Sequence, residues 1–254
     1  MGIRQMTSAE VLKETWLSTY NQEMFPIATQ LTQLNCNLHI MKKIASFPFT
    51  ELGEIVNDFW YLTCASMFET NVMIVWRLVD PKKNVHSISN LRSKIANNLK
   101  NDGLRVEFEA LTEKAEFDTK VVDIREKVKV IRHNRFAHSQ ITWIVKQEPL
   151  LIDEDSLPIS DLEAMASTLS DLYDLLCFGE KRSLYLRDYD PNVMHPGKAH
   201  RSDIERVLDS VAKDSSLVNM PERDIAWPYL KKLLDPSELR IMLHFRKKFG
   251  LSDV

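Results

Sequence analysis

Glycine is scarce in this chain, and its apolar residues recur at helical rather than strand spacing. Only six of the 254 residues are glycine. No segment shows the clear alternation of apolar and polar residues that a half-buried strand needs. Apolar residues separated by three and four positions recur instead along most of the chain. These features predict an all-α protein.

The pattern before residue 180 predicts a helical bundle. We expect Ser8 to cap a first helix and the apolar segment after it to continue or pair with that helix. Thr50 then starts a helix of about 30 residues that ends at Asp80. A shorter helix follows, with Ser87 or Ser89 as its cap.

One long amphipathic helix is predicted over 104–131, because apolar spacings of three and four continue across that range. A further helix covers 158–179. Beyond residue 180 the chain becomes polar and loop-like before two more helices. The predicted organisation is therefore an up-and-down helical bundle over 1–180 and a C-terminal helical extension over 181–254.

The last helix of the extension has a clear start. Asp235 is a capping residue, Pro236 suits the first helical position, and Glu238 completes a capping box. Gly250 is a natural stop. This helix is basic, which is compatible with RNA binding and equally with complementation of the helix dipole. Its basic residues are Arg240, His244, Arg246, Lys247 and Lys248.

Charge and cysteine usage narrow the classes of function. A formal net charge of -3 argues against extensive coating of nucleic acid, although a local basic site stays compatible with it. Cys36, Cys64 and Cys177 are widely spaced and form no CxxC pair, as expected for reduced thiols without a zinc site. Residues 1–20 lack the apolar run of a signal peptide, and polar residues interrupt the most apolar segment, 59–79. We therefore expect a cytoplasmic protein without membrane contact.

The clearest chemical signal lies at the end of the predicted 104–131 helix, in Arg132-His133-Asn134-Arg135-Phe136-Ala137-His138. Arginine stays cationic, whereas imidazole can take or give a proton near neutral pH. Phosphodiester chemistry without a metal needs these two groups, a proton shuttle beside a fixed positive charge. No metal-binding or cofactor-binding motif is present, so we predict neither a metal nor a cofactor.

A purely structural explanation competes with this one. The same predicted helix begins with acidic residues and ends with basic ones, as the helix macrodipole favours. Spacing adds a constraint, because on an ideal helix Arg132 and His138 lie about 9 Å apart along the axis and about 120° around it. Two copies meeting across a dimer axis, or a helix that unwinds before Ala137, would bring them together.

The motif and its helical surroundings resemble HEPN domains. Arg132, the polar His133 and then His138 follow the Arg-(Asn/Asp/His)-x(3–5)-His signature of that superfamily. The ending from Asn134 to His138 is similar to that of its abortive-infection branch, and the order of helices over about 50–178 agrees with it.

The resemblance implies an all-α, commonly dimeric domain, of a kind that often cleaves RNA without a metal. His138 would be the proton shuttle for attack by the ribose 2′-hydroxyl, and Arg132 would stabilise the charge of the transition state. His133, Asn134 and Arg135 would be auxiliary residues that contact RNA or hold the loop. The implied partners are RNA, a second copy, and an antitoxin or immunity protein.

Two other functions stay open. The chain could be a catalytically inert HEPN-like module that binds RNA or protein, or a structural dimer whose basic helix end only satisfies the dipole. Gln140 occupies the position where some HEPN toxins have a modified Tyr, so that form of regulation is not predicted. His195 and His200 lack the carboxylate pattern that a metal site would need.

Overall fold

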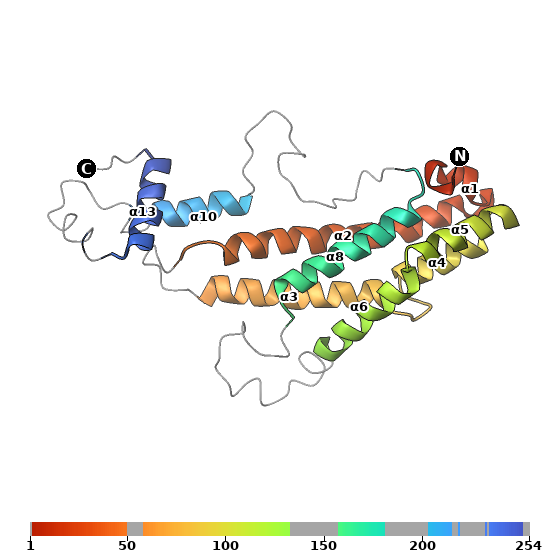
Figure 1. Ribbon diagram of the computed structural model, residues 1–254, viewed down its shortest axis with the longest axis horizontal. Helices are drawn as coiled ribbons and strands as arrows, with labels where there is room; N and C mark the ends of the chain where they lie inside the picture. The colour runs from red at the N-terminus through yellow and green to blue at the C-terminus, as the bar shows by residue number, and fades with distance from the viewer. Residues whose placement is uncertain are drawn as a thin grey trace. The chain divides into compact units, whose positions relative to one another are not determined.

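Helices make up the regular structure of this protein wherever its computed structural model describes the chain (Figure 1). The described residues are 2–49, 58–132, 157–180, 203–214, 218, 232 and 234–250. Within them, the pairing of Leu12 with Leu99 is an isolated bridge and no strand forms. The all-α prediction is confirmed.

The chain divides into two compact units, one formed by 1–38 with 67–189 and the other by 39–66 with 190–254. The domain boundary expected near residue 180 stays a prediction. Two long helices contribute residues to both units, namely α2 (Leu17–Ala45) and α3 (Asp58–Val79). The first unit also contains η1 (Ile3–Gln5), α1 (Ser8–Val11), η2 (Glu14–Trp16), α4 (Ile88–Asn97), α5 (Asp102–Lys114), α6 (Phe117–Ile131) and α8 (Ile159–Leu176). The second contains α10 (Asp203–Asp214) and α13 (Pro236–Lys248).

The N-terminal segment differs from the prediction in its capping. Thr7, not Ser8, precedes α1, and the Glu10 carboxylate accepts hydrogen bonds from the Thr7 backbone N–H and hydroxyl. Ser8 instead donates its hydroxyl to Glu180, which ties the N-terminal segment to the chain beyond α8. Gly179 lies against the same segment, since its N–H donates to the Met6 carbonyl at 2.8 Å and a Cβ there would lie only 3.1 Å from that oxygen.

The single helix predicted over 104–131 is wrong, because the segment forms two helices, α5 and α6. Glu116 separates them in the left-handed region, with φ of 54°. Periodicity conceals the break because Phe108 on α5 and Phe117 on α6 are both buried in one core. The acidic start and basic end that the dipole argument used therefore belong to different helices.

Other predicted boundaries agree more closely. Ser87 caps α4 by accepting a hydrogen bond from the Asn90 N–H. The helix predicted over 158–179 is α8, which begins one residue later and ends at Leu176. The predicted start of α3 at Thr50 lies outside the described residues, and α3 ends at Val79 as expected.

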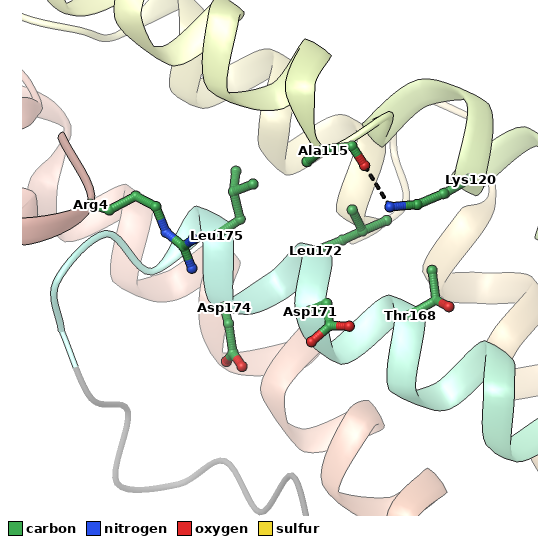
Figure 2. Close-up of a pocket in the computed structure, with 8 residues that line it drawn as sticks. All are labelled: Arg4, Ala115, Lys120, Thr168, Asp171, Leu172, Asp174 and Leu175. Carbon is green, nitrogen blue, oxygen red and sulfur yellow. Dashed lines mark hydrogen bonds between the residues drawn. The ribbon is translucent and has the colours of Figure 1, made fainter. Parts of the chain in front are cut away.

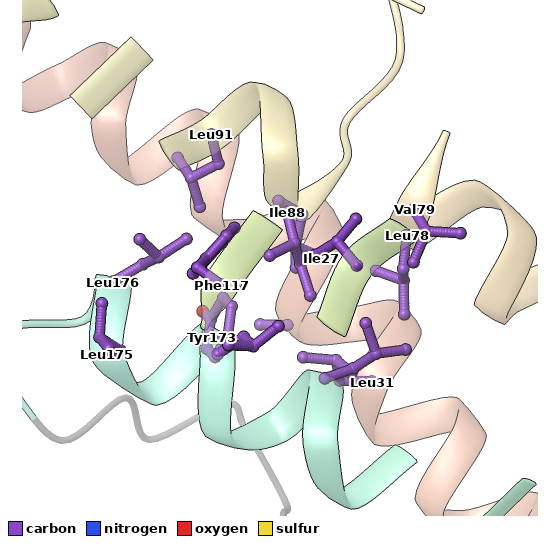
Figure 3. Close-up of a cluster of buried hydrophobic side chains, with 14 of the residues drawn as sticks. Ile27, Leu31, Leu78, Val79, Ile88, Leu91, Phe117, Tyr173, Leu175 and Leu176 are labelled. Carbon is purple, nitrogen blue, oxygen red and sulfur yellow. The ribbon is translucent and has the colours of Figure 1, made fainter. Parts of the chain in front are cut away.

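The core of the first unit is one apolar cluster to which most of its helices contribute side chains. Figure 3 shows side chains of α2, α3, α4, α6 and α8 converging on one apolar cluster. Two buried tyrosines join α2 to α8, since Tyr20 donates to the Leu176 carbonyl at 2.8 Å and Tyr173 donates to the Met24 carbonyl at 3.4 Å. The helices α3 and α6, which carry the candidate site, pack into the same core through side chains such as Leu78 and Phe117.

The second unit has a smaller core, formed by Ala212, Val218, Met242 and Phe245. Asp235 accepts hydrogen bonds from the N–H groups of the first turn of α13, as the capping prediction requires. The helix stops before Gly250, whose φ of 71° suits glycine.

Candidate functional site

Arg132 is placed by the last turn of α6. Its backbone is helical, and its N–H donates to the carbonyls of Val128 and Lys129. Val128 and Ile124, on the inward face of the same helix, are buried in the core of the first unit. The guanidinium therefore projects from a backbone that packing holds in place.

The Arg132 guanidinium lies over the indole ring of Trp76, with its central carbon 4.8 Å from the ring centroid. Trp76 is in the last turn of α3, and both side chains are half-buried. A cation at this distance from a tryptophan face is attracted by the ring quadrupole, which stabilises such a pair by about 0.5–2 kcal/mol depending on desolvation. Two helices thus hold one guanidinium in a defined direction.

Two cations of α6, Arg125 and Lys129, share one carboxylate. Glu126 pairs with both Lys129 and Arg125, at 3.2 and 3.5 Å. The hydrogen bond from Lys129 is the largest cause that keeps the pKa of Glu126 below its usual range. In the part of the chain that the structure describes, no carboxylate pairs with Arg132.

The connection from α3 to α4 is closed by hydrogen bonds from side chains to its own backbone. The Asp80 carboxylate accepts the Lys82 N–H at 3.0 Å, which closes a turn after α3. The Asn90 side-chain amide then donates to the carbonyls of Lys82 and Val85, at 2.6 and 2.8 Å. These hydrogen bonds from side chains to the backbone explain why Asp80 and Asn90 suit their positions.

A second charged cluster ties this connection to α2. The Glu23 carboxylate contacts Lys94 on α4 at 2.6 Å and His86 at 2.9 Å. Burial alone would raise the pKa of Glu23, but the hydrogen bonds and charges of Lys94 and His86 outweigh burial and lower it. Each of the three groups has its partner within the cluster, so we assign the cluster a structural role.

A hollow of about 310 Å³ is lined by residues of α8 and of the α5–α6 junction (Figure 2). Lys120 lines the hollow, but its ammonium group donates a hydrogen bond to the Ala115 carbonyl at 2.8 Å. Arg4, Asp171 and Asp174 also line it, without a histidine or cysteine. It offers no proton shuttle of the kind that the sequence motif suggested.

Arg132 is the one predicted site residue that lies within the described residues. His138, the predicted proton shuttle, lies outside them, as do His133, Asn134 and Arg135. Gln140, His195 and His200 also lie outside. Within the described ranges no group of three or more His, Cys, Asp and Glu could hold a metal ion, and no helix has the length and apolar content to cross a membrane.

The sequence motif did not include Trp76, which the structure places beside Arg132. Its ring does pack against core residues, but its other contact is the Arg132 guanidinium. Its position could have indicated this contact, because Trp76 lies in the last turn of α3, a helix within the range that resembles HEPN domains.

Comparison with known proteins gives one finding on family. The model of the HEPN_AbiU2 family, described as AbiU2, matches residues 51–191, which is more than half of the chain. The matched segment includes Trp76 and the whole motif from Arg132 to His138. No curated protein and no solved structure matches the chain.

Proposed function

The chain belongs to the AbiU2 family of HEPN domains, and we propose that it is a metal-independent endoribonuclease of abortive-infection or toxin–antitoxin type. The family match supports a function in abortive infection. The observation that carries the catalytic part is the Arg132 guanidinium, which is held over Trp76 at the end of α6 and has no carboxylate partner among the described residues. Such a cation suits a phosphate that gains negative charge during reaction.

In the proposed reaction, the imidazole of His138 takes the proton of the ribose 2′-hydroxyl as that oxygen attacks the adjacent phosphorus. Arg132 stabilises the extra negative charge of the pentacoordinate transition state. The bond from phosphorus to the 5′-oxygen breaks, and the protonated imidazole returns its proton to that oxygen, which leaves a 2′,3′-cyclic phosphate and a 5′-hydroxyl. His133, Asn134 and Arg135 contact the RNA or hold the segment that carries His138.

The site is proposed to form between two copies of the chain. Arg132 has helical backbone angles, and a helix continued to His138 would turn the two side chains about 120° apart. In a dimer, Arg132 of one copy would meet His138 of the other. We place this reaction in the cytoplasm, where an antitoxin or immunity protein would restrain it.

The test is RNA cleavage by purified protein in EDTA. Arg132→Ala should lower the rate by about 10²–10³-fold, as loss of a transition-state donor does. His138→Ala should lower it by about 10²–10⁴-fold, as loss of a general base does. Arg125→Ala and His86→Ala are matched controls, since each removes the same type of side chain from a described ion pair, and both should keep near-wild-type rates.

The dimer is tested by mixing. Arg132→Ala and His138→Ala proteins, each inactive alone, should regain activity when they are combined and allowed to exchange subunits. RNA binding without cleavage, lost on Arg132→Ala, would replace the enzyme with an inert RNA-binding module. Wild-type behaviour of both variants in every RNA assay would leave the motif with a structural role only.

A further inference from the structure

The basic residues of α13 fall into two groups, and one group serves the fold. Arg246 is buried and donates a hydrogen bond to the Val218 carbonyl at 3.0 Å. Lys248 forms an ion pair with Asp209 of α10 and lies 5.4 Å from the centroid of the Phe245 ring. These two cations bind α13 to the rest of the second unit.

The other group consists of Arg240, His244 and Lys247, all of them exposed. Positions four and three apart fall on one face, within about 60° around the helix axis. Over the described residues, no carboxylate pairs with any of the three. We call this surface the α13 basic face.

The helix dipole does not account for the α13 basic face. Lys247 lies in the last turn, where a cation is favoured. Arg240 is only the fifth residue of the helix, just beyond a first turn that contains the acidic Glu238. A cation so close to the N-terminal end gains nothing from the dipole, and its exposure means that it contributes nothing to the core.

The length and chemistry of this face fit a polyanion. Arg240 and Lys247 are separated by about 10 Å along the axis, a span that covers more than one phosphate of a nucleic-acid strand. The apolar side of α13 is already occupied, since Met242 and Phe245 are buried in the core of the second unit. A helix that binds a membrane surface needs that side free to enter lipid, so the observations favour RNA over a membrane.

We propose that Arg240, His244 and Lys247 bind the phosphate backbone of the RNA that the protein cleaves, as a second contact separate from Arg132 and His138. This inference rests on the proposed function. The α13 basic face lies outside the segment 51–191 that the family model matches, so the family match does not assign it a role. Backbone contacts of this kind strengthen binding without selecting sequence.

The experiment measures binding of a fluorescent single-stranded RNA whose riboses are 2′-O-methylated, so that it cannot be cleaved. The double variant Arg240→Gln/Lys247→Gln should weaken binding roughly tenfold at 100 mM salt and reduce the slope of log K against log salt by about 1.4. Exchanging the two cations, in Arg240→Lys/Lys247→Arg, should preserve both. The control Lys83→Gln/Lys114→Gln removes the same charge from exposed positions of the first unit and should behave as wild type.

Cleavage assays separate this proposal from the proposed function. If RNA is cleaved in EDTA, the double variant should raise KM and leave kcat unchanged. Active protein whose KM, affinity and salt slope are unaffected by the double variant would overturn the basic face while the endoribonuclease stands. Inactive protein whose RNA affinity still falls in the double variant would support the face and refute the enzyme. Tighter binding to vesicles of anionic lipid than to RNA, lost in the same variant, would also overturn the proposal.

Discussion

The contact between Trp76 and Arg132 can be measured as a coupling free energy. The relevant changes are Trp76→Leu, which removes the indole ring, and Arg132→Met, which removes the charge but keeps much of the side-chain volume. The separation of 4.8 Å lies within the range of about 6 Å for an effective cation–π contact, and the pair is half-buried. We therefore expect a coupling of about 1 kcal/mol, between the values of exposed and desolvated pairs.

The assay is urea unfolding of wild type, both single variants and the double variant, followed by far-UV circular dichroism. The cycle cancels the packing that each substitution loses by itself and leaves the interaction of the pair. Arg105→Met combined with Trp76→Leu is the control, because Arg105 lies on α5 and pairs with Glu109. Its coupling should be close to zero.

A coupling for Trp76 and Arg132 no larger than that of the control would refute the idea that the indole orients the guanidinium. If the endoribonuclease is active, Trp76→Leu should slow cleavage, because the Arg132 guanidinium loses the ring that orients it; a loss of about 1 kcal/mol of transition-state stabilisation would correspond to about fivefold. Trp76→Phe retains an aromatic face and should lose less.

Three further outcomes follow from the first unit. Glu116→Gly should stabilise the protein by about 0.5–1 kcal/mol in thermal unfolding, because a left-handed backbone is costly for any residue with a Cβ. Glu113→Gly, in the last turn of α5, should instead destabilise it by up to about 1 kcal/mol. Tyr20→Phe should cost about 1–3 kcal/mol, because it leaves the buried Leu176 carbonyl without that donor, and a loss below about 0.5 kcal/mol would contradict this. Glu23→Gln tests pH dependence. The lowered pKa of Glu23 means that wild type should exceed the variant in stability above the ordinary value of 4.5 and lose that advantage as the pH falls through the folded-state pKa. A gap that widened in acid would be the opposite of this expectation.

The parts of the fold that the sequence predicted correctly depend on neighbouring residues. Ser87 and Asp235 cap their helices through hydrogen bonds to N–H groups within three residues, so the signal and the structure lie in the same short segment. The break at Glu116 was missed because α5 and α6 both bury one side in the same core, which keeps the apolar period nearly continuous.

The candidate site could be predicted only in part, for the same reason. The motif identified Arg132, but its contact with Trp76 joins α6 to α3, and periodicity does not reveal which helices pack together. Likewise, all five basic residues of α13 looked equivalent in the sequence. Burial and pairing separate Arg246 and Lys248 from the α13 basic face.

Chemical analysis of the RNA ends tests the central claim most directly. An end-labelled RNA and the same RNA with a 2′-deoxyribose at the cleaved position are incubated with the protein in EDTA. Attack by the 2′-hydroxyl predicts a 2′,3′-cyclic phosphate and a 5′-hydroxyl from the first RNA, no cleavage of the second, and loss of both products in His138→Ala. Cleavage at the deoxyribose position, or the same products from His138→Ala, would contradict the account.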